Sequence, residues 1–374
     1  MLAIIQSFFS WSAYGIPAFL FLITVVVFFH ELGHFSVARL FGVRVETFSI
    51  GFGRALYSWR DSKGTLWKIS WIPLGGFVKF FGDADGASKP DREAAARMDA
   101  ADRQVAFPFK PLWQRALIVV AGPVANFVLA LVILTGLFMV IGRVLTPAHV
   151  TEVVPHSAAQ AAGIHAGDMI VSIDGDTIES YEQIQQIISL SAGVRLPITV
   201  KRGDRLLTVF ATPRETEVVD PFKNKMKVGQ LGIRNSARRE ITRLGPIDAV
   251  RAAVAEIGDV ISVSFRARDQ IFKGSGSQLS GPIGIAKLSG QVAAVSFLAL
   301  IHLAALLSVS IGLVNLFPVP MLDGGHLLYY ACEGVLGRPL GERAQDVGFR
   351  LGLAVVLGIF ILATWNDLAR LNLF

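Results

Sequence analysis

Four long runs of apolar residues dominate the hydrophobic pattern of this chain. The segments that hold them are 1–41, 112–143, 291–345 and 346–374. A helix needs roughly 20 mainly apolar residues to cross the hydrocarbon core of a bilayer. The pattern therefore predicts an α-helical membrane protein with four transmembrane helices.

The first run must be distinguished from a secretory signal peptide, which begins with basic residues and ends at a small-residue cleavage site. No Lys or Arg precedes Arg39, and the apolar stretch continues directly into His30-Glu31-Leu32-Gly33-His34. We therefore predict that the first run is kept as a transmembrane helix.

The segments between the runs differ in character. Over 42–80, β-forming residues alternate with glycines, which predicts β-hairpins beside the membrane. Segment 81–111 is charged and rich in alanine, as expected for a solvated loop. Segment 147–213 has the composition of a soluble domain. Segment 214–290 is expected to be a linker with an amphipathic helix over 246–271.

The distribution of basic residues predicts an orientation in the membrane. Lys and Arg are frequent between Arg39 and Arg115. Cytoplasmic loops of membrane proteins carry such an excess. We therefore expect this loop in the cytoplasm. Because the number of predicted spans is even, both termini and segment 147–213 are expected on the outer side.

Composition supports the membrane assignment and excludes several kinds of site. Only 17% of residues are charged and 52% are hydrophobic, with a mean hydropathy of +0.53, whereas soluble domains carry about 25% charged residues. The net charge is +6, but no basic stripe with interleaved aromatics indicates nucleic-acid binding. Cys332 is the only cysteine, which excludes an intramolecular disulfide and a cysteine-based metal site. Any metal must therefore be bound by His and carboxylate groups.

A candidate metal motif, His30-Glu31-Leu32-Gly33-His34, lies at the inner end of the first predicted span. On a helix, residues i and i+4 share one face about 6 Å apart along the axis, so His30 and His34 can bind one ion. Glu31 would then act as general base on a metal-bound water. Ionisable residues at membrane depth are costly and usually functional. A polar cluster that holds helices together is the alternative.

A catalytic zinc normally has three protein ligands and a water, so the third ligand must come from another segment. Asp323 is the first carboxylate after a long uncharged stretch, and Pro318 and Pro320 should break the helix just before it. Broken backbone beside a carboxylate at membrane depth suits a metal site. His326 is a competing ligand, with a polar residue at a helix start as its alternative role. His302 is expected to be a core histidine, with ligation as the alternative.

Two motifs connect the chain to a known family: His30-Glu31-x-x-His34 and Asn315-x-x-Pro318-x-x-x-Leu322-Asp323-Gly324. Together they resemble the site-2 protease family of intramembrane zinc metalloproteases, specifically its bacterial regulator-of-sigma-E protease branch. Further similar stretches lie at 48–53, 72–79, 121–127, 280–287 and 342–346. The resemblance therefore extends over nearly the whole chain.

The resemblance implies roles for five residues. His30, His34 and Asp323 would bind Zn²⁺, and Glu31 would be the catalytic base. Asn315 would contact the backbone of the substrate.

The resemblance also implies a role for the hairpin region. It is similar to the membrane-associated β-hairpin of the family, which holds an unwound substrate as an added strand. We accordingly name Gly51, Gly53, Gly75 and Gly76 as candidate substrate-binding residues.

Segment 147–213 resembles a bacterial PDZ domain. A short helix over 157–164 precedes a glycine turn and the strand at 169–173, then an Asp174-Gly175 hairpin follows, and 181–190 supplies a second helix. The best-known members of the branch carry two tandem PDZ domains, whereas this chain has room for one. The predicted fold is thus four transmembrane helices, a membrane-associated β-hairpin region and one inserted extracytoplasmic PDZ domain.

The function implied by the resemblance is that of a zinc-dependent intramembrane endopeptidase. It would cleave transmembrane segments of single-pass proteins, such as anti-sigma factors already shortened by another protease, and remnant signal peptides as a second class. The implied location is the bacterial inner membrane, with both termini periplasmic. A non-catalytic PDZ adaptor is one alternative. A metal or proton transporter is the other, although the His and acidic residues cluster at one depth instead of crossing the bilayer.

Overall fold

The computed structural model describes residues 2–83, 97–178, 180–219, 225–235, 240–272 and 281–370. The chain divides into two compact units, one formed by 1–134 with 279–374 and the other by 135–278. Part of the predicted loop 81–111 lies outside the described residues.

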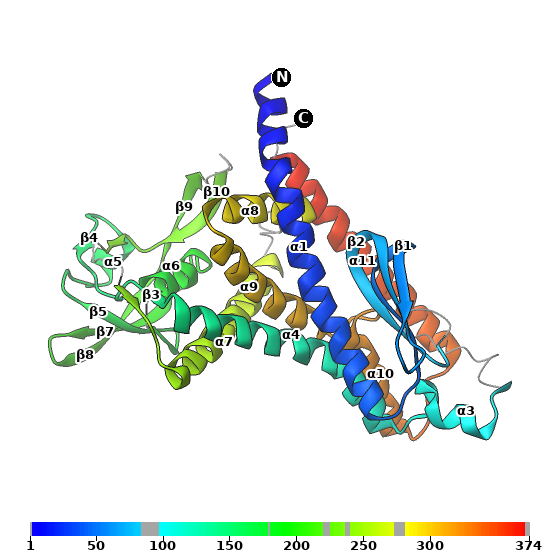
Figure 1. The fold of residues 1–374 in the computed structure, drawn as a ribbon. Helices are drawn as coiled ribbons and strands as arrows, with labels where there is room; N and C mark the ends of the chain where they lie inside the picture. The colour runs from blue at the N-terminus through cyan, green and yellow to red at the C-terminus, as the bar shows by residue number, and fades with distance from the viewer. Residues whose placement is uncertain are drawn as a thin grey trace. The chain divides into compact units, whose positions relative to one another are not determined.

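Among the described residues, four helices are long and apolar enough to cross a membrane. They are α1 (Leu2–Leu40), α4 (Leu112–Val140), α9 (Phe297–Asn315) and α11 (Glu342–Arg370). α11, red in Figure 1, exposes large apolar side chains such as Leu351, Ile359 and Ile361. An extended apolar surface of this kind marks contact with lipid or another protein. The prediction of four long apolar helices is confirmed.

The third predicted span is divided into two helices. α8 (Pro282–Val295) ends before Ser296, and α9 begins immediately after it. The backbone of Ser296 is extended, and its hydroxyl accepts a hydrogen bond from the Leu298 N–H, which caps α9. The predicted boundary at 290–291 is therefore wrong. A local cap decides where the helices divide, and the hydrophobicity of the run does not change there.

Segment 42–80 forms one long antiparallel hairpin of β1 (Val45–Arg60) and β2 (Leu66–Phe80), which packs beside α1 (Figure 1). The first half of β1 lies between the two halves of β2, so that Ser49 faces Phe77 on one side and Lys68 on the other. Phe48 and Ser49 are buried, whereas Tyr57 is exposed. The hairpin therefore has a packed base and an exposed apolar and aromatic end.

Short helices complete the first unit. They are α3 (Ala100–Val105), the 3-10 helix η1 (Phe107–Phe109) and α10 (Asp323–Leu336). α10 follows α9 after a non-helical turn that contains Pro318 and Pro320. The predicted break of the helix at these prolines is therefore observed.

The second unit combines short strands with helices. Its strands are β3 (Arg143–Leu145), β4 (Glu152–Val153), β5 (Met169–Ile173), β6 (Asp176–Thr177), β7 (Leu196–Arg202), β8 (Arg205–Ala211), β9 (Arg214–Val219), β10 (Lys225–Gln230), β11 (Ile233–Arg234) and β12 (Glu240–Thr242). Its helices are α5 (Ala158–Ala161), α6 (Tyr181–Ser189) and α7 (Pro246–Phe272). Strands β6, β5, β7 and β8 form one antiparallel sheet in that order. α6 packs on the core of this unit through Ile184, Ile187 and Ile188.

The small domain does not end at Pro213, where the sequence predicts its boundary. β11 pairs with β4, and Leu231 is buried in the same core as Ile170 and Ile198. The predicted linker 214–290 therefore contains strands as well as α7. The boundary is wrong because pairing partners distant in sequence, and not local composition, define the edge of a sheet.

A buried carboxylate links two neighbouring strands of the sheet in this domain, β5 and β7. Asp168 is 1% exposed and forms a two-point ion pair with Arg202, with Nε–Oδ1 at 2.7 Å and Nη2–Oδ2 at 2.8 Å. These hydrogen bonds from Arg202 hold the pKa of Asp168 below its ordinary value. A carboxyl with a depressed folded pKa stabilises the domain above its unfolded pKa of about 3.9, and this contribution is lost as the pH falls through the folded pKa.

The substitution Asp168→Asn is therefore expected to remove a pH-dependent part of the domain's stability. At neutral pH, amide hydrogen exchange in β5 and β7 should be faster in the variant than in the wild type. The difference should shrink as the pH falls below about 4, where the unfolded chain binds the proton, and should vanish below the still lower pKa of the folded wild-type carboxyl. Asp204→Asn, at an exposed turn, is the matched control and should change neither curve. An undiminished difference at low pH would contradict this account.

Candidate metal centre

Two imidazoles of α1 meet at a point where α1 and α4 pack closely. His30 and His34 are one helical turn apart and both are buried. A Cβ atom at Gly122 of α4 would lie 2.2 Å from His34 Nε2 and 2.9 Å from His30 Cε1. Any side chain at this position would therefore displace the imidazoles.

Asp323 reaches the two histidines from the start of α10. The turn before it is tight, since a Cβ atom at Gly324 would lie 2.2 Å from the carbonyl oxygen of Phe317. Asp323 Oδ2 lies 3.1 Å from His30 Nε2 and 3.5 Å from His34 Nε2. The two Nε2 atoms are 3.2 Å apart. Three ligand-type atoms therefore form a nearly equilateral triangle.

This triangle fits a tetrahedral zinc ion. Ligand atoms about 2.0–2.2 Å from such an ion lie roughly 3.3–3.5 Å from one another, close to the observed separations. Asp323 Oδ2 is buried and lacks a hydrogen-bond partner. Metal binding requires this group as a carboxylate, which is the ordinary form of an aspartate side chain at neutral pH.

The other ring nitrogen of each histidine has a polar neighbour. His34 Nδ1 lies 2.8 Å from the carbonyl oxygen of Ile118. A carbonyl oxygen only accepts, so Nδ1 carries the proton and Nε2 keeps its lone pair for a metal. His30 Nδ1 lies 3.3 Å from the side-chain nitrogen of Asn126, which is fully buried.

Turning the Asn126 amide over would give its side-chain oxygen a hydrogen-bond partner. Its Oδ1 atom is buried without a partner in the observed orientation. The two ends of an amide have the same shape, so a rotated Asn126 can accept a hydrogen bond from His30 Nδ1–H through Oδ1. That arrangement leaves His30 Nε2 free to bind a metal.

Asn126→Leu is accordingly expected to weaken zinc binding by about 10- to 100-fold, as is typical for loss of an outer-shell partner. Asn126→Asp retains an acceptor oxygen and should retain most of the affinity. Competition with a zinc chelator on the folded variants measures this without an activity assay. Equal zinc affinity in Asn126→Leu and the wild type would show that Asn126 does not orient His30.

Glu31 borders a cavity of about 630 Å³ together with His30, His34 and Asp323. Specific ligand sites in proteins range over about 300–1,000 Å³. The Glu31 side chain also lies close to the backbone of Val78 on β2. A carboxylate thus stands beside the three ligand-type atoms and faces the same open space.

The predicted substrate-binding residues divide into two groups. Asn315, Gly75 and Gly76 line the cavity. Gly51 and Gly53 are not among its lining residues, and their φ angles of +85° and +86° serve a sharp change of direction in β1. The geometry therefore favours a shaping role for Gly51 and Gly53 and direct access to the site for the other three.

The two other histidines considered from the sequence are outside the ligand group. Among the described residues, the metal-ligand cluster contains His30, His34 and Asp323 but neither His326 nor His302. His326 lines the cavity, so its imidazole borders the same space as the ligand cluster. Its place in the cavity still makes it the first substitute ligand to test.

Sequence reasoning missed the contributions of α4 to the site. Gly122 and Asn126 lie in a stretch that resembles the family, but no role was assigned to them. The spacing Gly-Pro-x-x-Asn on an apolar helix is a signal, because a polar amide within a predicted span needs a partner. Nothing in the sequence indicates that the partner is His30.

Known proteins resemble this chain over most of its length. The profile of Peptidase family M50 matches residues 18–359. A protein of Agrobacterium fabrum, provisionally named a zinc metalloprotease, is 43% identical and covers 96% of this chain and 97% of its own length. Metalloprotease MmpA of Caulobacter vibrioides is 41% identical over 95% of both chains.

A solved structure also resembles part of the chain. It is the PDZ domain of an SdrC-like protein from Listeria monocytogenes, with 23% identity and a TM-score of 0.20. The likeness covers 24% of this chain and 88% of that domain.

The family match includes the segments that carry His30, Glu31, His34 and Asp323. It confirms the family that the two sequence motifs indicate. The chain belongs to Peptidase family M50.

Proposed function

We propose that this protein is a zinc metalloendopeptidase that hydrolyses a peptide bond within the membrane. One observation carries the proposal: His30, His34 and Asp323 converge beside Glu31 in one cavity. Both histidines and Glu31 belong to a helix that is apolar enough to cross a bilayer. A buried His and carboxylate cluster at such a depth requires a function that compensates for its cost.

The residues divide the chemistry between them. His30, His34 and Asp323 would hold a zinc ion, which would supply Lewis-acid polarisation of the substrate carbonyl and activation of a water at about neutral pH. Glu31 accepts a proton from the attacking water and delivers it to the nitrogen of the departing amine. Asn315 borders the same cavity and can hydrogen-bond the substrate backbone through its amide.

The backbone of β2 is the proposed surface that pairs with the substrate backbone. Leu74, Gly75 and Gly76 are consecutive and all line the cavity. Consecutive residues of a strand point to opposite sides, so the backbone itself borders the cavity here. A substrate helix must unwind to expose its scissile amide, and an extended segment can then hydrogen-bond such a strand. The hairpin is therefore the proposed binding surface for unwound substrate.

We assign single-pass membrane proteins as substrates, with anti-sigma factors shortened by a first protease as the main class and remnant signal peptides as the second. The assigned location is the bacterial inner membrane. The domain that begins at 147, with its four-stranded sheet and α6, is assigned as a PDZ domain on the outer face, where it would restrict entry of substrates with bulky outer domains.

The proposed orientation predicts opposite labelling of two single-cysteine variants in a Cys332→Ser background. Asp204→Cys lies in an exposed turn of the outer domain, and Gln104→Cys lies at an exposed position of α3. An impermeant thiol reagent added outside intact cells should label Asp204→Cys and not Gln104→Cys. Permeabilised cells are the control, in which both variants should react. Labelling of Gln104→Cys from outside would overturn the orientation.

The function is tested by incubating the purified protein in lipid vesicles with tagged single-pass membrane proteins. Cleavage within an apolar segment is expected, and it should stop with a zinc chelator and return with added zinc. A folded protein that binds no zinc would favour the adaptor. Zinc or proton movement across the vesicle without cleavage of any segment would favour the transporter.

A further inference from the structure

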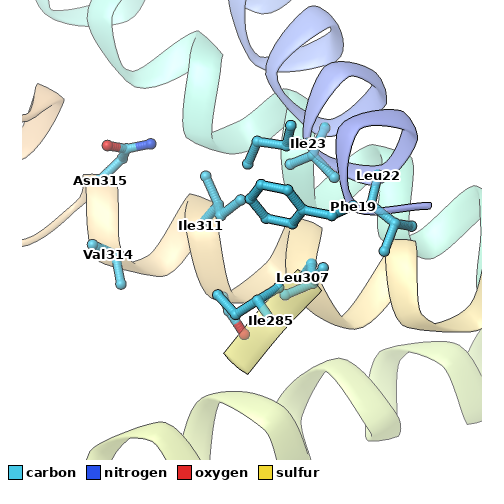
Figure 2. A pocket seen from close by; sticks show the side chains of 10 residues that line it. Phe19, Leu22, Ile23, Ile285, Leu307, Ile311, Val314 and Asn315 are labelled. Atoms are coloured by element: carbon cyan, nitrogen blue, oxygen red, sulfur yellow. The ribbon is translucent and has the colours of Figure 1, made fainter. Parts of the chain in front are cut away.

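A second cavity lies within the first unit between α1, α8 and α9. Its volume is about 220 Å³. The side chains that enclose it include Phe19, Leu22, Ile23, Ile285, Leu307 and Ile311. Figure 2 shows the ring of Phe19 directed from α1 toward Ile311 of α9. The cavity is therefore apolar on all three helices.

This second cavity adjoins the catalytic one. Ile311 and Asn315 line both. On α1, the face that carries Leu22, Ile23 and Val26 at the second cavity continues one turn later with Val27 and His30 at the catalytic cavity. The two spaces thus follow one another along the same pair of helices.

We propose that the second cavity receives an apolar side chain of the substrate and thereby sets a sequence preference for cleavage. The inference rests on the peptidase function proposed above. Asn315, the proposed contact for substrate backbone, borders both spaces. Figure 2 shows it among the residues that line the second cavity. Ile311 lies one helical turn before Asn315, about 6 Å along α9, which is within reach of a leucine or phenylalanine side chain.

Volume and lining define the preferred side chain. An apolar cavity of about 150 Å³ binds a benzene molecule, so 220 Å³ admits a side chain as large as that of phenylalanine. Among the described residues that line it, the polar ones are Ser310 and Asn315. A charged side chain would lose its hydration there without an opposite charge to compensate. The preference is therefore for Leu, Ile, Met or Phe over Ala, and against Lys or Asp.

Helix geometry also locates this side chain relative to the scissile bond. From Ile23 to His30 the helix rises about 10 Å. An extended peptide advances roughly 3.3 Å per residue. The residue that enters the cavity is therefore about two to four residues from the bond that is cut.

The experiment uses a synthetic single-span peptide with an alanine-rich apolar segment and a central glycine pair that favours unwinding. Mass spectrometry maps the bond that the wild type cuts. Each residue within four positions of that bond is then changed to Ala, Leu or Phe, one at a time. At one position, Leu or Phe should raise kcat/KM by about 10- to 100-fold over Ala.

Variants of Leu307 connect that preference to the cavity. Leu307→Phe fills the space and should abolish the preference at that position, so that the Ala, Leu and Phe peptides are cut with nearly equal kcat/KM. Leu307→Ala enlarges the space and should shift the preference from Leu toward Phe. Leu298→Phe, on an exposed part of α9, is the matched control and should leave all rates unchanged. A Leu307→Phe variant that slows every peptide equally would overturn the proposal. It would mean that a lipid chain occupies the cavity or that its lining residues serve only to pack the helices.

A binding measurement separates this inference from the proposed function. Glu31→Gln protein is titrated with the Leu and Ala peptides, and the Leu peptide should bind about 10- to 100-fold more tightly. Leu307→Phe combined with Glu31→Gln should remove this difference. If the wild type cuts no peptide but the affinity difference exists, the peptidase function fails and the binding cavity stands. If peptides are cut but neither rate nor affinity depends on side-chain size, the cavity proposal fails and the function stands.

Discussion

Glu31→Gln is expected to leave zinc bound and to reduce proteolysis by about 10²- to 10⁴-fold, the range typical of losing general acid–base catalysis. Gln has nearly the same size and polarity as Glu but cannot accept a proton from the attacking water. Glu31 is also outside the ligand cluster, so the geometry that holds the metal should not change. Zinc content of the purified variant and cleavage of one single-pass substrate are the two measurements.

Glu31→Asp is the matched control, because it keeps a carboxylate but withdraws it by one methylene. It should hold zinc and retain more activity than Glu31→Gln. Unchanged proteolysis in Glu31→Gln would contradict the mechanism. The adaptor and transporter functions would then have to be tested again.

Loss of zinc is the second large effect, expected for His34→Ala and Asp323→Asn. His34→Ala removes one of the three ligands. Asp323→Asn replaces the carboxylate ligand with a neutral amide, which binds zinc more weakly. The loss of affinity should exceed the 10- to 100-fold expected when an outer-shell residue such as Asn126 is removed. Proteolysis should decrease in parallel, because the ligand set holds the ion that activates the water.

His326→Ala provides the control for the ligand variants. His326 lines the same cavity but lies outside the ligand cluster, so this variant should keep its zinc. If Asp323→Asn retained full zinc and normal turnover, Asp323 would not be the third ligand. In that case His326 would be the first residue to examine by double substitution with Asp323.

Local patterns in the sequence predict the long helices well. The apolar run over 112–143 contains the helix α4. A bilayer offers no water to backbone N–H and C=O groups, and a helix satisfies them all within one segment. The pairing of His30 with His34 is equally local, since four residues make about one helical turn. Their assignment as zinc ligands, with Asp323 as the third, stays a prediction until metal binding is measured.

Boundaries that depend on distant partners were not predictable in the same way. Composition places the end of the small domain at Pro213, but β11 returns to pair with β4. The division of the third run at Ser296 depends on one side chain that caps α9. Neither event alters the hydrophobic pattern along the chain.

The sequence by itself determined the family, the four apolar helices and the motif residues, because each depends on residue types at short, regular spacing. Tertiary structure alone decided that Asp323 lies within 3.5 Å of both imidazoles, that Asn126 faces His30, and that a second cavity adjoins the catalytic one. These contacts join helices that are far apart along the chain. Their distances follow from how helix surfaces pack, and packing depends on the shapes of all the neighbouring side chains together.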